Sequence, residues 1–373
     1  MKIVIIQGAF LPVPPIRGGA VEKIWYKMGQ EFVKLGHEVI HIGRSHPELA
    51  ESELVNGARY IRIKGYDIPF SLLKLKWLDL LYSFHAIRHI PKDTDIIVTN
   101  TFWSPVLLRG NLGKRVYVSV ERLPKGQMRF YKHVGTIRGC SPLIFNLIKK
   151  EINPKFDSKV SYIPNPVPFD VKEFNSEKKK IILFVGRLNK EKGLEILIDA
   201  FNKLDRSIST SWLLNIVGPH EVKDGGSGDN YLAYLKQISQ SLNINFIGPV
   251  FNEDELIKYY IESKIFCYPA QNGSGDAAPV APREAMAYGC VPIVSKLECF
   301  NDFINNGVNG FQFDQGSKQQ SAELSGILFQ LMSNEIETEV ISNQAKLIVQ
   351  DYSSPVIASL FIDDFKKQIK RNG

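Results

Sequence analysis

Short β-branched and aromatic runs alternate with longer stretches of helical periodicity along most of the chain. Residues 21–35, 72–90 and 141–150 carry apolar side chains at the three- and four-residue spacing of helices with one buried face. Strands are predicted around them at the runs KIVIIQ, HEVIHIG, ARYIRIK, TDIIVTN, RVYVSV, GTIRGCS and SYIPNPV. Alternation of this kind favours a parallel sheet wound on both faces by helices.

The second half of the chain repeats the pattern. The runs KKIILFVGRL, LLNIVGP, NINFIGPV and KIFCYPA each precede a helical stretch, and KDGGSGD at 223–229 is predicted to be a surface loop. Three prolines, Pro164, Pro166 and Pro168, interrupt regular structure between the halves. We therefore predict an α/β protein with two Rossmann-like domains, residues 1–167 and 168–352, and a terminal helix within 353–373.

Charge narrows the set of partners only slightly. A formal net charge of +7 and a pI near 9.0 favour anionic partners such as nucleotide phosphates or anionic lipid. Since nucleic-acid binding would rest on net charge alone, no nucleic-acid partner is expected.

Cysteine usage and hydropathy indicate the compartment. The four cysteines form no C-x-x-C pair and have no companion histidine spacing, so buried thiols in a reducing compartment are expected. The apolar run at residues 1–6 has the length of a strand, and no run approaches the roughly 20 apolar residues of a membrane span. We expect a cytoplasmic protein, with peripheral membrane contact as a further option.

The stretch from Cys267 to Ser295 reads CYPAQNGSGDAAPVAPREAMAYGCVPIVS. A predicted strand leads into a loop of small residues with Asp276, and a predicted helix follows with Glu284 in its first turn. Strand, small-residue loop and helix N-terminus together can place an anion against unpaired backbone N–H groups. Taken alone, the two carboxylates would be interpreted as a helix cap and a solvated first-turn residue.

A second motif, FVGRLNKEKG, covers residues 184–193. A buried strand ends at Gly186, and Arg187 and Lys192 lie on the turn before the next helix. Two cations at the carboxyl end of a strand can hold a diphosphate. In isolation, two solvated cations in an edge loop would be an equal alternative.

Together these motifs resemble the retaining glycosyltransferases of family 4, which have the GT-B fold. Asp276 and Glu284 have the spacing of that family's E-x7-E signature, EAMAYG-CVPIVS resembles EAMA-G-PV-S, and Arg187 and Lys192 match G-R-x4-K-G. Two departures concern the sugar: Asp276 replaces Glu, and Ala277 to Pro279 replace Gly-Phe-Gly. The resemblance implies two domains facing each other across a cleft, with the last helix returning to the first domain.

The resemblance also implies the site residues. Arg187 and Lys192 would neutralise the departing nucleotide diphosphate, Glu284 would bind the ribose hydroxyls, and Asp276 the sugar, so these four are the catalytic candidates. No metal and no cofactor are expected. The donor-binding set would comprise Gly18, Gly19, Gly186, Arg187, Lys192, Asp276, Ala277, Ala278, Val280, Ala281 and Glu284.

The acceptor side is expected in the first domain. Arg17 and Glu22 flank the Gly18-Gly19 turn, and Glu22 matches a Glu common in the family's first helix. Where the family often has a His after the fifth strand, this chain has Glu121-Arg122. Glu121 could be a base, a partner of a sugar hydroxyl, or an ion-pair partner of Arg122.

Two further features have simpler interpretations. Asp93-Thr94-Asp95 has the metal-binding D-x-D pattern but precedes its strand, whereas sites lie at carboxyl ends, so turn residues are predicted. The helix at 72–89 is amphipathic and basic. Core packing explains it most simply, and contact with an anionic membrane is the alternative.

The predicted function is a metal-independent, retaining hexosyltransferase that uses a nucleotide-diphospho-sugar. A UDP-sugar is favoured over a GDP-sugar, and the acceptor would be a glycan, a lipid-linked molecule or a small molecule in polysaccharide or glycolipid biosynthesis. The alternative is a catalytically silent nucleotide-sugar-binding protein of the same fold. A nicotinamide dehydrogenase is disfavoured because neither first strand is followed by G-x-G-x-x-G.

Overall fold

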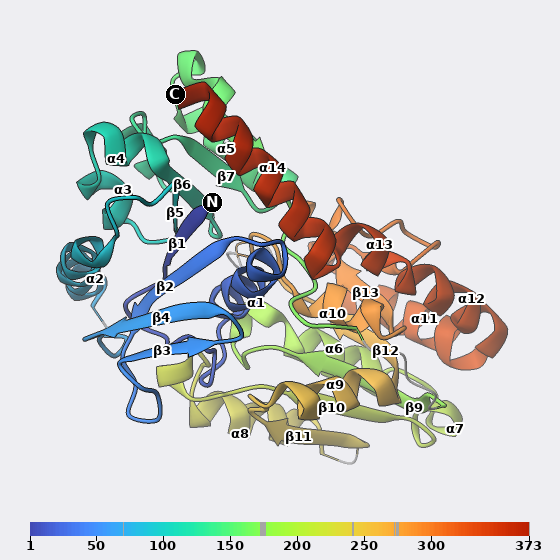
Figure 1. The fold of residues 1–373 in the computed structure, drawn as a ribbon. Helices are drawn as coiled ribbons and strands as arrows, with labels where there is room; N and C mark the ends of the chain where they lie inside the picture. Colours follow the sequence, from blue (N-terminus) through green and yellow to red (C-terminus); the bar gives the residue numbers. More distant parts are fainter. Residues whose placement is uncertain (70, 172–176, 241, 272, 274–275, 373) are drawn as a thin grey trace. The chain divides into compact units, whose positions relative to one another are not determined.

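The computed structural model describes residues 1–373 except 70, 172–176, 241, 272, 274–275 and 373 (Figure 1). The chain divides into two compact units, Met1–Phe169 with Tyr352–Gly373, and Asp170–Asp351. Each unit contains one sheet flanked by helices. The predicted α/β class with two parallel-sheet domains is confirmed, with one antiparallel exception in the first unit.

The first sheet has the strand order β3-β4-β2-β1-β5-β6-β7-β8. Its strands are β1 (Lys2–Ile6), β2 (Glu38–Arg44), β3 (Ser52–Val55), β4 (Ala58–Ile63), β5 (Ile96–Thr99), β6 (Val116–Val120), β7 (Thr136–Gly139) and β8 (Val160–Tyr162). Its helices are α1 (Ala20–Lys34), α2 (Leu72–Ala86), α3 (Trp103–Leu107), α4 (Gly110–Arg115), α5 (Pro142–Glu151) and α14 (Ser354–Asn372), with the 3-10 turns η1 (Ile87–His89), η2 (Gln127–Phe130) and η3 (Pro154–Lys159).

The edge strand β3 was not predicted, and it makes this sheet mixed. It pairs antiparallel with β4, and the two strands are joined by Asn56 and Gly57, whose φ values are 49° and 79°. Positive φ at both central residues is the geometry that favours Asn-Gly in two-residue hairpins. The other strand pairs of the sheet are parallel.

The second sheet is parallel throughout, in the order β11-β10-β9-β12-β13-β14. Its strands are β9 (Lys179–Val185), β10 (Leu213–Val217), β11 (Ile244–Gly248), β12 (Ser263–Tyr268), β13 (Val291–Ser295) and β14 (Phe311–Phe313). Its helices are α6 (Leu194–Asn202), α7 (Arg206–Ser209), α8 (Asp229–Ile238), α9 (Glu253–Glu262), α10 (Ala281–Ala287), α11 (Gln320–Ser333), α12 (Glu335–Lys346) and α13 (Ile348–Tyr352), with η4 (Lys190–Lys192), η5 (Val222–Asp224) and η6 (Glu298–Phe300).

The terminal helix α14 packs on the first unit. Phe361 lies 5.1 Å from the Trp25 ring of α1, and Phe365 lies 4.8 Å from the Tyr117 ring of β6. The Tyr117 hydroxyl also donates to Asp364 at 2.8 Å. Aromatic pairs at these centroid separations stabilise the folded state by more than their buried apolar area alone would contribute. The helix that follows the second unit in sequence is therefore part of the first unit's core.

Each sheet contains a point at which the strand order reverses. The chain builds outward from β1 through β2 and then restarts on the other side at β5; in the second unit it restarts at β12, beside β9. In open α/β sheets, ligands bind outside the carboxyl ends of the strands at such switch points. The edges after β1 and β5, and after β9 and β12, are accordingly the places to look for a site.

Candidate functional site

The two sequence motifs of the second unit meet because β9 and β12 are adjacent and parallel. Gly186 to Lys192 follow β9, and the stretch that contains Asp276 follows β12. The Gln271 backbone N–H donates to Glu191 O at 2.8 Å and joins the two segments. Gly193 has φ of 66°, and a Cβ there would lie 2.1 Å from Pro269 O, so this close approach requires glycine.

Lys192 and Asp276 form an ion pair at this switch point. Lys192 Nζ donates to both carboxylate oxygens of Asp276, at 2.6 and 2.8 Å. The side chains are only 4% and 13% exposed, and Nζ also lies 5.3 Å from the centre of the Tyr268 ring. Two residues predicted to contact different parts of a donor thus contact each other.

Arg187 lies beside the glycine-rich segment. Its guanidinium is 3.5 Å from the Glu191 carboxylate and is about half exposed. At Gly225, a Cβ would lie 2.5 Å from Arg187 NH1, and Ser227 N donates to Leu188 O at 2.9 Å. The KDGGSGD segment therefore packs against the Arg187 turn, which is a closer association than that of the surface loop predicted from its composition.

Glu284 lies in the first turn of α10 and is 3% exposed. The Tyr260 hydroxyl of α9 donates to Glu284 Oε2 at 2.7 Å. Burial and the Glu284 charge raise the pKa of Tyr260 well above its ordinary value, so the phenol keeps its proton and holds the carboxylate in place. Sequence reasoning missed Tyr260, because it appears as one more aromatic position in a helix.

Small and buried side chains surround this carboxylate. Arg283 is fully buried, pairs with Asp302 at 3.0 Å and stacks on Phe303, which fixes α10. The residues that were predicted to contact the donor through their backbone are buried or half-buried: Ala277, Ala278, Val280 and Ala281.

In the first unit, the Gly18-Gly19 turn accommodates the Glu22 side chain. Gly18 and Gly19 have φ of 72° and 99°, and a Cβ on Gly19 would lie 2.3 Å from Glu22 Oε2. Arg17 contacts Asp67 at 3.7 Å. The turn thus brings the Glu22 carboxylate to the end of β1, next to Gly8.

Two amide side chains with buried oxygens lie at the switch point of the same sheet. Gln7 follows β1 and is fully buried, and neither its Oε1 nor its Nε2 has a hydrogen-bond partner among the described residues. Asn100 follows β5, and its Oδ1 likewise has none within the described part of the chain. Buried polar atoms are ordinarily paired with protein or water, so this edge has unused capacity for polar contacts.

Glu121 belongs to a buried network centred on Arg138 of β7. Arg138 donates to Glu121 Oε1 at 2.6 Å, and Asn165 Nδ2 donates to Glu121 Oε2 at 2.9 Å. Arg138 also donates to Ser119, Asn165 and the Ile163 carbonyl. The neighbouring Arg122 is exposed, and among the described residues it forms no ion pair with Glu121.

The sequence comparisons locate the family in the second unit. The sequence profile of the glycosyl transferases group 1 family matches residues 168–347. Residues 168–347 are a glycosyl transferases group 1 domain. An uncharacterized glycosyltransferase of Methanocaldococcus jannaschii is 25% identical over 418 residues, covering 100% of both chains.

Solved structures of glycosyltransferases share the fold of the whole chain. Sucrose-phosphate synthase from Thermosynechococcus elongatus superposes with a TM-score of 0.82 at 17% identity and covers 100% of both chains. HepE of Anabaena, in complex with UDP and glucose, gives a TM-score of 0.73 at 16% identity and covers 98% of this chain and 100% of its own. The chain thus has the GT-B fold of these glycosyltransferases, and the Lys192–Asp276 pair lies within the residues that match the group 1 family.

Neither the D-x-D pattern nor any other acidic cluster forms a metal site in the described part of the chain. Lys2 Nζ pairs with Asp93 at 2.6 Å, and the Lys2 backbone N–H donates to Asp95 at 2.8 Å. These are turn residues at the amino end of β5. No group of three or more His, Cys, Asp or Glu side chains in the described ranges is arranged to hold an ion.

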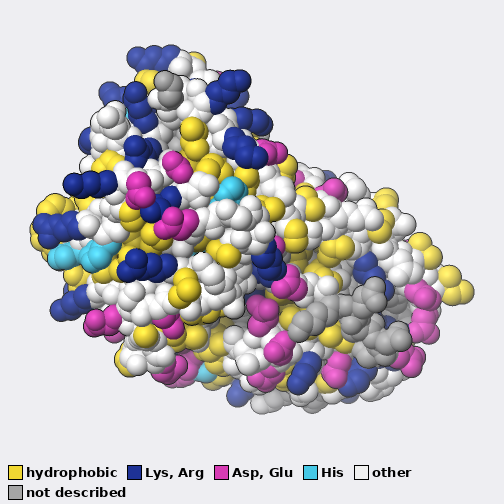
Figure 2. All heavy atoms as spheres, in the orientation of Figure 1, with side chains coloured by type: hydrophobic (Ala, Val, Ile, Leu, Met, Phe, Trp, Pro, Cys, Tyr) yellow, Lys and Arg dark blue, Asp and Glu magenta, His cyan; other side chains and the backbone are white. Residues whose placement is uncertain are grey.

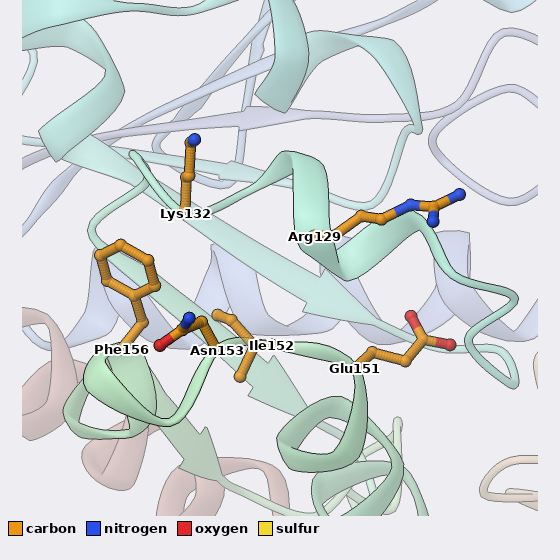
Figure 3. A pocket seen from close by; sticks show the side chains of 6 residues that line it. All are labelled: Arg129, Lys132, Glu151, Ile152, Asn153 and Phe156. Atoms are coloured by element: carbon orange, nitrogen blue, oxygen red, sulfur yellow. The ribbon is translucent and has the colours of Figure 1, made fainter.

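A separate pocket of about 260 Å³ lies in the first unit, between η2, the end of α5 and η3 (Figure 3). Its Glu151 carboxylate accepts hydrogen bonds from the Gly126 and Met128 backbone N–H groups, so that carboxylate anchors the loop before η2. Figure 3 shows the Arg129 and Lys132 side chains extending in different directions. The pocket contains none of the predicted site residues.

Burial raises the pKa of Glu22 from 4.5 to about 7, although its own backbone N–H and the charge of Arg122 act in the opposite direction. The folded protein therefore holds a proton on Glu22 between pH 4.5 and 7 that the unfolded chain releases, and stability should fall as pH rises through that window. The loss by pH 8 should approach about 3 kcal/mol.

The Glu22→Gln variant should lack this loss, since its amide does not titrate. We expect urea unfolding at pH 5 and pH 8 to show wild type losing more stability than Glu22→Gln. If the free energies of unfolding of the two proteins changed equally between pH 5 and pH 8, the raised pKa of Glu22 would be contradicted.

Proposed function

We propose that this glycosyltransferase transfers a sugar from a nucleotide-diphospho-sugar, with a UDP-sugar favoured over a GDP-sugar, and does so with retention and without a metal. The observation that carries the proposal is the set of two cations and two carboxylates, Arg187, Lys192, Asp276 and Glu284, at the switch point of the group 1 domain. The structure of HepE with UDP and glucose, which shares the fold, supports the choice of nucleotide.

The chemistry requires stabilisation of a diphosphate leaving group. The Lys192 ammonium already binds an anion in this structure, because its Nζ donates to both carboxylate oxygens of Asp276. Arg187 is half exposed on the same turn, and we assign it to a second phosphate. Fixed positive charge at a developing anion is commonly the largest single contribution to such catalysis.

Recognition of the nucleotide is assigned to Glu284. A carboxylate accepts two hydroxyl hydrogen bonds at once, which suits the diol of a ribose. Tyr260 fixes the position of this carboxylate through Oε2, and the Arg283–Asp302 pair fixes its helix. A preorganised acceptor of this kind loses little freedom on binding.

The acceptor is assigned to the first unit and would be a glycan, a lipid-linked molecule or a small molecule. Glu22, Gln7 and Asn100 place one carboxyl and two amide groups at the carboxyl edge of its sheet. Such groups suit a polyhydroxylated ligand. Because both oxygens of Glu121 accept hydrogen bonds from Arg138 and Asn165, Glu121 is assigned a positioning role.

A second candidate is a nucleotide-sugar-binding protein without turnover. Ala277 to Pro279 replace the Gly-Phe-Gly of the resembled family, and Glu121 is engaged with Arg138 where that family often has a His. Both features concern the groups that would act on the sugar and acceptor, and neither changes Arg187, Lys192 or Glu284, which are assigned to the nucleotide.

One experiment separates these functions. A thermal-shift panel of UDP-, GDP- and ADP-sugars should raise the melting temperature most for one nucleotide, since ligands that bind the native state stabilise it. The radiolabelled form of that donor should then release its sugar, at least by slow hydrolysis. A thermal shift without any release of sugar would favour the silent protein, and no shift with any nucleotide would contradict both candidates.

A further inference from the structure

Helix α2 exposes large apolar side chains. Leu72, Leu73, Trp77 and Phe84 are 77%, 82%, 60% and 46% exposed. The sequence favoured core packing for this helix, but the residues that it buries are Asp79, Tyr82, Ser83 and Ala86. The simpler interpretation is therefore wrong for its outer face.

Polar contacts hold α2 in this orientation. The Asp79 carboxylate accepts hydrogen bonds from the Phe102 and Trp103 backbone N–H groups at the start of α3. The Trp103 indole N–H in turn donates to Lys76 O at 2.9 Å. Since α2 is anchored through its polar inner side, its apolar side chains are displayed outward as a fixed feature of the fold.

The exposed face is also basic. Lys74 and Lys76 of α2 and Arg88 of the following η1 are exposed, and Arg88 stacks on Phe84 at 4.3 Å. The one acidic residue of α2, Asp79, is buried. Figure 2 shows Lys and Arg atoms beside hydrophobic atoms over the region where Figure 1 places α2.

The surrounding unit has the same sign of charge. The first unit contains 29 Lys and Arg against 15 Asp and Glu, a balance of +14, whereas the second contains 17 against 24, a balance of −7. A positive balance concentrated in the unit that displays the apolar side chains favours a partner that is both anionic and apolar.

We propose that α2 docks this protein on the surface of an anionic phospholipid bilayer. Leu72, Leu73, Trp77 and Phe84 enter the boundary between headgroups and acyl chains, and Lys74, Lys76 and Arg88 contact the lipid phosphates. Trp suits this depth because its ring is apolar and its N–H is polar. Among the described residues no helix is long and apolar enough to cross a membrane, so the contact is with one surface. This inference is independent of the proposed donor chemistry.

The test is flotation of the full chain with vesicles of phosphatidylglycerol in phosphatidylcholine, and with phosphatidylcholine alone. Wild type should float with the anionic vesicles, and L73S/W77S should reduce the bound fraction by about tenfold or more, because exposed apolar area drives insertion. The matched control I336S/V340S removes side chains that are 79% and 58% exposed on α12 of the second unit, and it should float like wild type.

The basic side chains of α2 and the insertion of Trp77 into the bilayer can each be tested separately. K74E/K76E should weaken binding, with a loss that resembles the effect of high salt on wild type. Trp77 fluorescence should shift to the blue on vesicle binding, and the shift should be absent in W77S. Unaltered flotation of L73S/W77S, or equal binding of wild type to neutral vesicles, would overturn the proposal. A third result would also overturn the proposal: wild type binds no vesicles but forms a dimer, and L73S/W77S abolishes that dimer. In that case α2 is a contact between two copies of the chain.

Discussion

Replacing Arg138 by Met is expected to destabilise the first unit by about 3–5 kcal/mol, because removal of one partner leaves a buried charge uncompensated. Arg138 is fully buried, and the Glu121 side chain that it pairs with is only 5% exposed. The guanidinium also donates to Ser119, Asn165 and the Ile163 carbonyl, so the substitution leaves several buried acceptors without a donor. Urea unfolding of both proteins measures the difference.

The double variant Arg138→Met/Glu121→Gln should recover part of this loss. It removes both charges, and replacing a whole buried pair costs much less than breaking it. A double-mutant cycle with Glu121→Gln alone then gives the coupling energy. A coupling near zero would mean that Glu121 is solvated and available as a base, contrary to the positioning role.

The sequence predicted the strands best where their runs are long and apolar. The strands β1 and β9 lie within KIVIIQ and KKIILFVGRL. The edge strand β3 was missed because its residues alternate between exposed and half-buried and form no apolar run, although Asn56-Gly57 marked its hairpin. β14 has three residues, too few to show a period.

The residues of the second-unit motifs were found from the sequence, but their contacts were not. Lys192 and Asp276 are 84 positions apart in the chain, and they meet only because β9 and β12 are neighbours in the sheet. Arg138 stood within GTIRGCS as one polar residue of a strand, so nothing marked it as the partner of Glu121. Pairing across strands depends on topology, which local patterns do not contain.

Helix α2 illustrates a different limit of sequence reasoning. Its amphipathic and basic pattern was recognised, yet periodicity indicates only that two faces differ. Which face the domain covers was decided by Asp79, whose carboxylate accepts backbone hydrogen bonds at the start of α3. A buried acidic residue on an otherwise apolar helix is rare, and helical periodicity alone gives no sign of it.

Replacing Lys192 by Ala is expected to lower the rate of sugar transfer by about 10²–10³, the usual effect of removing one preorganised partner of a developing anion. Its Nζ is positioned by both oxygens of Asp276, at 2.6 and 2.8 Å, on the turn after β9 where the leaving diphosphate is assigned. Steady-state transfer, or donor hydrolysis where no acceptor is known, gives the rate. A rate equal to wild type, in a variant with an unchanged melting profile, would remove Lys192 from the site.

The Asp276→Asn variant should separate binding from turnover. The sequence alone predicts that it leaves affinity for the free nucleotide diphosphate unchanged, since Asp276 was assigned to the sugar. The ion pair with Lys192 changes that expectation. A diphosphate that approaches Lys192 meets the Asp276 charge a few ångströms away. Relief of that repulsion should tighten nucleotide binding by about tenfold or more, while transfer slows.

The Glu284→Gln variant should instead weaken binding of the free nucleotide, because Tyr260 holds the Glu284 carboxylate in place for the ribose. Calorimetry of both variants with UDP measures the two effects, and unchanged UDP affinity in Asp276→Asn would show that the ion pair does not oppose the diphosphate.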